Sequence, residues 1–388
     1  MADLYLPRIL KVGGGALASL PAALGQMGLS APLIITDPFL AKSGLLDRLT
    51  DVLDAAEVGY GVYPHAVTDP TTGAIDAALV ALRAGPYDCV LGFGGGSPID
   101  TAKAVAVLGA RAIPYAELKA PAQIDAPGLP IVAVPTTAGT GSEATRFTII
   151  TDEASDEKML CVGLAFLPSI AIVDYELTMA KPRRLTADTG IDSLTHAIEA
   201  YVSRKANPFS DAMALSAMRL IAPNLRRVCS DPDDRAARAA MMEGALHAGI
   251  AFSNASVALV HGMSRPIGAL FHVPHGLSNA MLLPAVTAFS APAAVARYAI
   301  CARAMGVAET GEGDQAAVAR LIEALTALNA DLDVPTPEAY GIARDVWHDH
   351  IPLMAEQAIA SGSPGNNPRV AEAAEIEGLY REIWGCLY

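Results

Sequence analysis

Residues 190–200 read Gly-Ile-Asp-Ser-Leu-Thr-His-Ala-Ile-Glu-Ala, a glycine followed by a pattern typical of a helix. Asp192 and His196 stand four positions apart, so on a helix their side chains lie one above the other, with Cβ atoms roughly 5 to 6 Å apart. A carboxylate and an imidazole in this arrangement can hold one divalent metal ion between them. For this stretch alone, the alternative is an ordinary Asp and His pair on a helix surface, because short motifs often occur by chance.

A second stretch, residues 260–276, reads Val-His-Gly-Met-Ser-Arg-Pro-Ile-Gly-Ala-Leu-Phe-His-Val-Pro-His-Gly and holds three of the eight histidines. His261 and His275 each precede a glycine, which would let the backbone pass close to a bound ligand, and neither resembles a core histidine. Together with Asp192 and His196 they would supply one oxygen and three nitrogens. This donor set suits Fe(II), Zn(II), Co(II) or Ni(II) better than Ca(II) or Mg(II), and it leaves a coordination position open.

A glycine loop, Gly94-Gly95-Gly96-Ser97-Pro98-Ile99-Asp100, lies between a strand-like run and a helical one. Its backbone N–H groups and the helix N-terminus would form an anion site, and a tight turn without a ligand is the alternative. The spacing differs from the dinucleotide fingerprint GxGxxG. The sequence therefore predicts a phosphate-binding loop of a related but distinct kind.

Two further polar groups follow strand-like runs. Thr136, Thr137, Thr140 and Ser142 come after residues 131–134 and would suit phosphates and the nicotinamide carboxamide, unless they form a simple serine and threonine turn. Asp37 closes the strand-like run 33–36, where its carboxylate would accept ribose hydroxyls and repel a 2′-phosphate. A helix cap is the alternative role for Asp37.

The order of these elements predicts the fold. Strand-like runs at 33–36, 58–63, 89–93 and 131–134 alternate with helical stretches, which indicates βαβ units and a parallel sheet. After about residue 182 the strand-like runs nearly vanish, and long helical stretches rich in Ala, Leu and Met take over. We expect an α/β, Rossmann-like dinucleotide-binding domain over residues 1–184 and an all-helical metal-binding and substrate domain over residues 185–388.

Composition limits the partners and the compartment. Of the 388 residues 52% are hydrophobic and 18% charged, and the net charge is −14, which argues against nucleic acid and anionic membranes. No apolar run approaches the roughly 20 residues of a membrane span. Five scattered cysteines without a CxxC pair, and an N-terminus without a signal-peptide pattern, predict a cytoplasmic protein. The few charges predict a homo-oligomer, a dimer or higher, unless one large core accounts for them.

Over nearly its whole length the sequence resembles the iron-containing (group III) alcohol dehydrogenases. In that family an Asp and a His on one helix, the His of an HG segment and the His of a PHG segment hold the metal, and Asp192, His196, His261 and His275 match them. The resemblance implies a dehydroquinate synthase-like architecture and an Asp37 that favours NAD over NADP. It also implies that the dinucleotide contacts Ser97, Asp100, Thr136, Thr137, Thr140 and Lys158.

The implied activity is hydride transfer between NAD and a primary alcohol or aldehyde, with Fe(II) as the expected metal, in a cleft between the two domains. The family pattern has a histidine where this chain has Arg265, so a proton relay at that position is in doubt. Arg265 would bind an anionic group of the substrate, such as a carboxylate or phosphonate, or else pair with a protein carboxylate. His272 would relay the proton instead, or serve as a buried structural histidine.

Two other functions remain open from the sequence. A lyase of the dehydroquinate synthase type would share this fold and use NAD and a metal only transiently, so it would form no net NADH. A non-catalytic metal-binding or filament-forming protein would need no intact cofactor loop, whereas the loop at residues 94–100 is complete.

Overall fold

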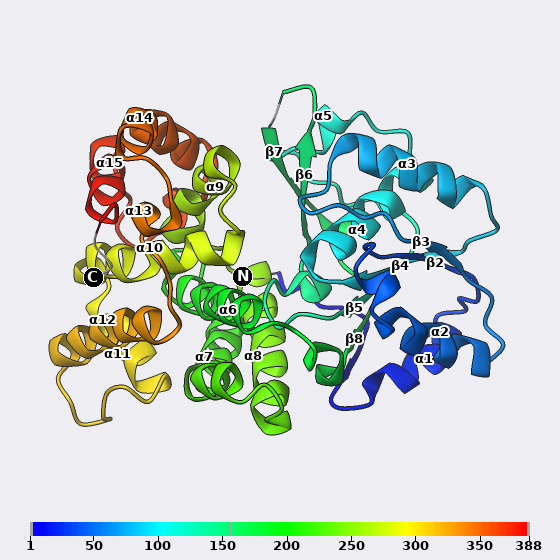
Figure 1. Cartoon of the computed structure of the whole chain (residues 1–388), viewed down its shortest axis with the longest axis horizontal. Helices are drawn as coiled ribbons and strands as arrows, with labels where there is room; N and C mark the ends of the chain where they lie inside the picture. Colours follow the sequence, from blue (N-terminus) through cyan, green and yellow to red (C-terminus); the bar gives the residue numbers. More distant parts are fainter. Residues whose placement is uncertain (1–2, 156, 386–388) are drawn as a thin grey trace. The chain divides into compact units, whose positions relative to one another are not determined.

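The computed structural model describes residues 3–155 and 157–385 (Figure 1). The chain divides into two compact units, Asp3–Ala180 and a second unit that begins at Lys181. The four cysteines within the described residues are free and buried, and Cys386 lies outside that range. No helix in the described part of the chain is long and apolar enough to cross a membrane.

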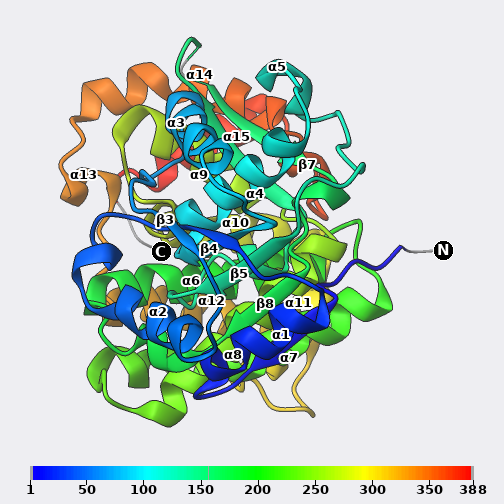
Figure 2. The same cartoon turned by 90° about the vertical axis from the view of Figure 1, so that its right-hand side faces the viewer.

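The first unit is built on a six-stranded sheet in the order β1-β8-β5-β4-β2-β3. All neighbouring strands of this sheet are parallel, and the succession β3, β4, β5, β8 can be followed in Figure 2. Strands such as Pro32–Ile35 are buried along their whole length, as expected for a parallel sheet covered on both faces. The strands are β1 (Ile9–Val12), β2 (Pro32–Ile35), β3 (Gly61–Tyr63), β4 (Cys89–Gly94), β5 (Ile131–Pro135) and β8 (Ile170–Val173).

Helices cover both faces of this sheet. Alternate strand residues point to opposite faces, so Leu33 and Ile35 enter one core cluster with α3 (Thr72–Arg83) and α4 (Gly96–Ala110), while Ile34 enters another with α1 and α2. The remaining elements of the unit are α1 (Leu20–Gln26), α2 (Leu45–Ala55), α5 (Tyr115–Leu118), η1 (Ala16–Ser19), η2 (Leu40–Lys42), η3 (Ser142–Ala144), η4 (Leu164–Phe166) and η5 (Tyr175–Thr178).

Three parts of this unit are absent from the sequence-based prediction. β1 is an edge strand with alternating partial exposure, and β8 is only four residues long. The third is an antiparallel hairpin of β6 (Phe147–Asp152) and β7 (Glu157–Val162), which forms its own two-stranded sheet. β1 and the hairpin strands are short and partly polar, whereas β8 is a short, wholly apolar run. Neither kind of strand shows a clear period of two in the sequence.

The second unit contains helices and no strand between residues 181 and 385. Its central helix is α6 (Arg183–Val202), which is buried from Gly190 onward and packs against α7, α8 and α10. The other helices are α7 (Pro208–Ser230), α8 (Arg235–Asn254), α9 (Leu259–Phe271), α10 (His275–Ser290), α11 (Val295–Ala304), α12 (Asp314–Asp331), α13 (Pro337–Tyr340), α14 (Arg344–Ala360), α15 (Ala373–Glu382), η6 (Ala291–Ala293) and η7 (Ser363–Asn366). The prediction of an α/β unit followed by an all-helical one is confirmed.

Candidate metal centre

The buried helix α6 carries polar side chains that a core helix does not need. Asp192, His196 and Glu199 are each less than 5% exposed and share one face, because they are four and three residues apart. α9 brings His261 to this face, and α10 begins with His275. One donor atom from each of Asp192, His196, His261 and His275 lies within 4.8 Å of all the others. The structure therefore brings together residues from three helices that are distant in sequence.

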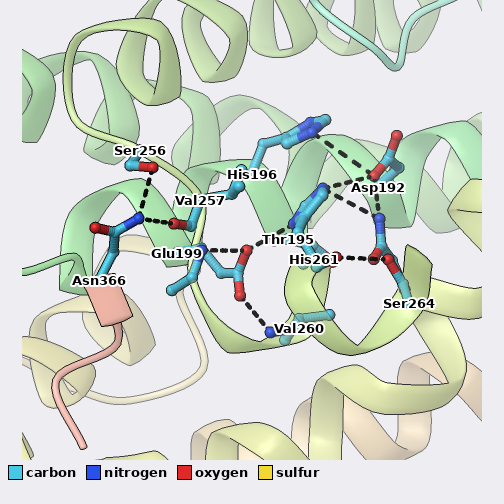
Figure 3. Close-up of polar contacts among 12 residues, drawn as sticks. Asp192, Thr195, His196, Glu199, Ser256, Val257, Val260, His261, Ser264 and Asn366 are labelled. Atoms are coloured by element: carbon cyan, nitrogen blue, oxygen red, sulfur yellow. Dashed lines mark hydrogen bonds and ion pairs between the residues drawn. The ribbon is translucent and has the colours of Figure 1, made fainter. Parts of the chain in front are cut away.

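The nearest ring nitrogens of the three histidines converge on Asp192 Oδ1, and Figure 3 shows the contacts of His196 and His261 with this carboxylate. His261 Nε2 lies 3.4 Å from this oxygen, and the Nε2 atoms of His196 and His275 each lie 3.8 Å from it. Two ligands of a tetrahedral ion with bonds of about 2.1 Å are roughly 3.4 Å apart. The spacing of these donors thus fits a small divalent metal ion.

The charges of the centre also favour a cation. Burial alone would raise the pKa of Asp192, but the imidazoles of His196, His275 and His261 outweigh it and hold the pKa well below the ordinary 3.8. Burial alone would lower the pKa of His261, but Glu199 and Asp192 raise it to about 9. Both shifts have the same physical cause, the attraction between the carboxylates and positive charge, so the centre is suited to a cation. Because a metal binds the neutral imidazole, its affinity would depend on pH.

Glu199 supports the centre from behind His261, a role that the sequence did not reveal. Its carboxylate accepts hydrogen bonds from His261 Nδ1 at 2.6 Å, from the N–H of Val260 at 2.6 Å and from the N–H of Ala258 at 3.0 Å (Figure 3). The bond to Nδ1 leaves Nε2 directed at Asp192, as in the carboxylate and histidine pairs that support metal sites. Its position three residues after His196, on the same helix face, is the signal that would have found it.

Asn279 is the second residue of the centre that sequence reasoning missed. Its Nδ2 donates to Asp192 Oδ1 at 2.7 Å and lies 3.1 Å from His261 Nε2 and 3.2 Å from His275 Nε2. Asn279 is fully buried, and its Oδ1 has no hydrogen-bond partner among the described residues. A buried amide oxygen without a donor beside this ligand set is consistent with a centre that is completed by a cation.

The glycines that follow His261 and His275 allow other parts of the protein, rather than a ligand, to pack closely against the backbone. A Cβ on Gly262 would lie 2.7 Å from Cδ of Pro364, and one on Gly276 would lie 2.4 Å from the backbone oxygen of Asp188. The expectation that neither histidine is a core residue is wrong for His261, which is 3% exposed. It holds for His275, whose side chain is 43% exposed.

The first unit brings the predicted cofactor loop and the threonine turn together. β4 and β5 are parallel neighbours that end at Gly94 and Pro135, and the two loops that follow them touch. A Cβ on Gly96 would lie 2.9 Å from Cγ2 of Thr140, and one on Gly95 would lie 3.5 Å from Thr137. α4 starts at Gly96 with no side-chain cap, so its first N–H groups are available to an anion.

The other predicted cofactor residues differ in whether their side chains form hydrogen bonds within the protein. Asp100 accepts hydrogen bonds from Ser142 Oγ at 2.6 Å and from the N–H of Ile149 at 3.1 Å, one on each carboxylate oxygen. Thr136 is fully buried, and its Oγ1 has no hydrogen-bond partner within the described ranges. The direct contacts of Asp100, Ser142 and Thr136 with a dinucleotide remain predictions.

Asp69 joins two more of the predicted residues. It pairs with Lys158 at 2.8 Å and donates its backbone N–H to Ser97 Oγ at 3.3 Å. Asp37 is partly engaged, because its Oδ1 accepts the N–H of Leu40 at 2.8 Å. This bond fits the capping alternative for Asp37 and leaves Oδ2 for a ribose, so both roles stay open.

Comparison with known protein families identifies the family to which a chain with these two sites belongs. Residues 7–175 match the family model described as iron-containing alcohol dehydrogenase, and residues 186–384 match that of the Fe-containing alcohol dehydrogenase family, C-terminal. The chain belongs to the iron-containing alcohol dehydrogenase family. It is thus an oxidoreductase of the iron-containing alcohol dehydrogenase type, as the resemblance implied.

Individual relatives of this dehydrogenase cover it almost completely. Lactaldehyde reductase of Escherichia coli K12 is 36% identical, over 96% of this chain and 97% of its own. The NAD-dependent methanol dehydrogenase of Bacillus methanolicus is 35% identical, over 98% of this chain and 99% of its own. A crystal structure of 1,3-propanediol oxidoreductase superposes with a TM-score of 0.93 at 34% identity, over 99% of this chain and 100% of its own.

Two further predicted residues of this dehydrogenase lie in the middle of α9 and at its C-terminal end. His272 ends the helix with a left-handed φ of 54° and is exposed, so the alternative of a buried structural histidine is wrong. Its role as a proton relay stays a prediction. Arg265 is half-buried and lies one helical turn after His261.

Proposed function

We propose that this dehydrogenase is an NAD-linked enzyme that interconverts a primary alcohol and the corresponding aldehyde. A divalent metal would be held by Asp192, His196, His261 and His275, and Fe(II) is the first candidate. Zn(II), Co(II) and Ni(II) are the other candidates for this donor set. The observation that carries the proposal is the convergence of the four donor atoms within 4.8 Å. We also propose that the enzyme is a cytoplasmic homodimer or a higher homo-oligomer.

When bound, a divalent ion acts as a Lewis acid that polarises the substrate oxygen. The protein's part is to hold the ligands in place. Asp192 supplies the negative charge, and Glu199 accepts a hydrogen bond from His261 Nδ1 so that Nε2 stays directed at the centre. The buried setting of α6 removes water from around these groups, which strengthens every electrostatic interaction among them.

The first unit would hold the dinucleotide. We propose that Gly94, Gly95, Gly96 and Ser97 bind the pyrophosphate through backbone N–H groups, a role supported by the uncapped start of α4. Thr136, Thr137, Thr140, Ser142, Asp100 and Lys158 would complete the contacts, and Asp37 would accept the ribose hydroxyls. The first unit would thus bind the hydride acceptor, and the second unit would bind the alcohol.

Oxidation moves a hydride from the alcohol carbon to C4 of the nicotinamide and releases the hydroxyl proton. Arg265 is unsuited to accept that proton, since a guanidinium stays protonated at working pH. His272 is exposed and three residues before His275, so we propose that it passes the proton to water.

Kinetics after metal reconstitution test the proposed function. The metal-free protein is loaded with Fe(II), Zn(II), Co(II) or Ni(II) and assayed with NAD or NADP against a panel of primary alcohols and aldehydes. Steady accumulation of NADH with a simple alcohol is the expected result. Turnover without net NADH would instead indicate a lyase of the dehydroquinate synthase type, and an inert, metal-loaded protein would indicate a binding role.

A further inference from the structure

Arg265 lies on the same helix as the predicted metal ligand His261. It follows His261 by four residues on α9, so the two side chains share one face of the helix, about 6 Å apart along its axis. The Cα–Cβ bonds of a helix tilt toward its N-terminus, so the side chain of Arg265 leans over the turn that carries His261. A group bound by Arg265 would therefore lie about one helical turn from a ligand of the centre.

Among the residues that the structure describes, the guanidinium of Arg265 has no hydrogen-bond or ion-pair partner. Of the six arginines from residue 181 onward that are buried or half-buried, five donate hydrogen bonds to the protein, namely Arg184, Arg238, Arg297, Arg303 and Arg369. Arg265 makes no hydrogen bond and no ion pair with any of residues 3–155 or 157–385. Five N–H donors on a half-buried cation normally find acceptors, so the set around Arg265 is incomplete.

The negative charge that acts on Arg265 already accepts hydrogen bonds from other groups. Burial lowers the pKa of Arg265, and attraction to Glu199 opposes that shift. The Glu199 carboxylate, however, accepts hydrogen bonds from His261 Nδ1 and from the N–H groups of Ala258 and Val260. The alternative that Arg265 pairs with a protein carboxylate thus finds no support among the described residues.

We propose that Arg265 determines specificity by binding the carboxylate of the substrate, so that this enzyme interconverts short ω-hydroxy acids and the corresponding oxo acids. The inference rests on the proposed alcohol dehydrogenase function. A guanidinium presents two parallel N–H groups to a carboxylate, and a short carbon chain spans the single turn between Arg265 and the His261 ligand. The carbinol carbon gives its hydride to NAD and the hydroxyl proton leaves, while the carboxylate is unchanged.

Matched substrates test this inference in the metal-loaded enzyme. The kcat/KM is measured for 4-hydroxybutanoate and for 1-butanol, and in the reverse direction for 4-oxobutanoate and butanal. Wild type is expected to prefer the acid of each pair. Arg265→Ala should lower the ratio of acid to neutral substrate on the order of 100-fold, which is typical for the loss of one partner of a desolvated charge pair.

Two variants separate a specific role from a structural one. Arg265→Lys keeps the charge but loses the fork, so it should restore part of the preference for the acid. Arg219→Ala, which removes an exposed arginine of α7, should leave the ratio unchanged. Binding of butanedioate to the metal-loaded protein, measured by calorimetry, should weaken in Arg265→Ala and not in Arg219→Ala. Sulfonate and phosphonate analogues of the acid show whether Arg265 selects carboxylates or any anion.

The outcomes distinguish the inference from the function on which it rests. If neither acids nor neutral alcohols reduce NAD or NADP, the proposed function fails. Only the role of Arg265 is overturned if neutral alcohols are oxidised but the acid has no higher kcat/KM. The same holds if Arg265→Ala lowers the kcat/KM of both substrates equally. An increased KM for NAD in Arg265→Ala, with an unchanged substrate ratio, would assign the guanidinium to the cofactor and also overturn it.

Discussion

Replacing Glu199 with glutamine should weaken metal binding without removing any ligand. The carboxylate holds His261 through a 2.6 Å bond to Nδ1 and also accepts two backbone N–H groups. A glutamine has only one acceptor oxygen, so its NH₂ group would face one of the three N–H donors that the Glu199 carboxylate satisfies. Loss of such a supporting bond typically lowers metal affinity 10- to 100-fold, about 1.4 to 2.7 kcal/mol.

The same change should destabilise the metal-free protein. The bonds from Ala258 and Val260 to Glu199 tie the start of α9 to α6, and a buried donor left without an acceptor costs about 1 to 3 kcal/mol. Competition with a chromophoric chelator gives the dissociation constant for Zn(II) or Co(II), and thermal unfolding gives the change in Tm. Glu243→Gln, an exposed carboxylate on α8, is the control. An unchanged dissociation constant in folded Glu199→Gln would refute the supporting role.

Three further predictions concern the metal ligands, the cofactor and a buried acid. His261→Ala and His275→Ala should each lose the metal and turnover but keep dinucleotide binding, because the ligands and the glycine loop lie in different units; elemental analysis and NAD titration measure both. Asp37→Ser should raise the kcat/KM for NADP relative to NAD, because it removes a charge that repels the 2′-phosphate. Glu143→Gln should raise the Tm at pH 8 but not at pH 4, because burial raises the pKa of Glu143 from 4.5 to about 7. The free energy of unfolding of wild type therefore falls by up to about 3 kcal/mol as the pH rises through that range.

Each of these predictions has a matched control. His350→Ala removes a histidine of α14 outside the ligand set and should retain the metal. Asp51→Ser removes an exposed carboxylate of α2 and should leave the cofactor preference unchanged. Glu117→Gln removes an exposed acid of α5 and should not alter the pH dependence of Tm. Full metal occupancy in His261→Ala, an unaltered cofactor ratio in Asp37→Ser, or equal Tm changes at both pH values in Glu143→Gln would contradict the respective assignment.

Local patterns determined the class of fold and the ligand set. The alternation of buried strands such as Pro32–Ile35 with helices is a short-range property, so it was readable from the chain and predicted the α/β unit. The spacing of Asp192 and His196 is likewise local, because one helical turn fixes it. Resemblance to a family then joined this pair to His261 and His275.

Only the tertiary structure decided which residues support and complete those local features. Glu199 and Asn279 belong to the centre because α6, α9 and α10 pack together, which places side chains 62 and 87 residues apart in direct contact. Asp100 proved to be engaged by Ser142 and Ile149 for the same reason. Arg265 was conspicuous in the sequence, but only the structure shows that it forms no hydrogen bond or ion pair with the described residues. Contacts of this kind depend on how helices and loops pack over long sequence separations, which one sequence without its three-dimensional arrangement does not specify.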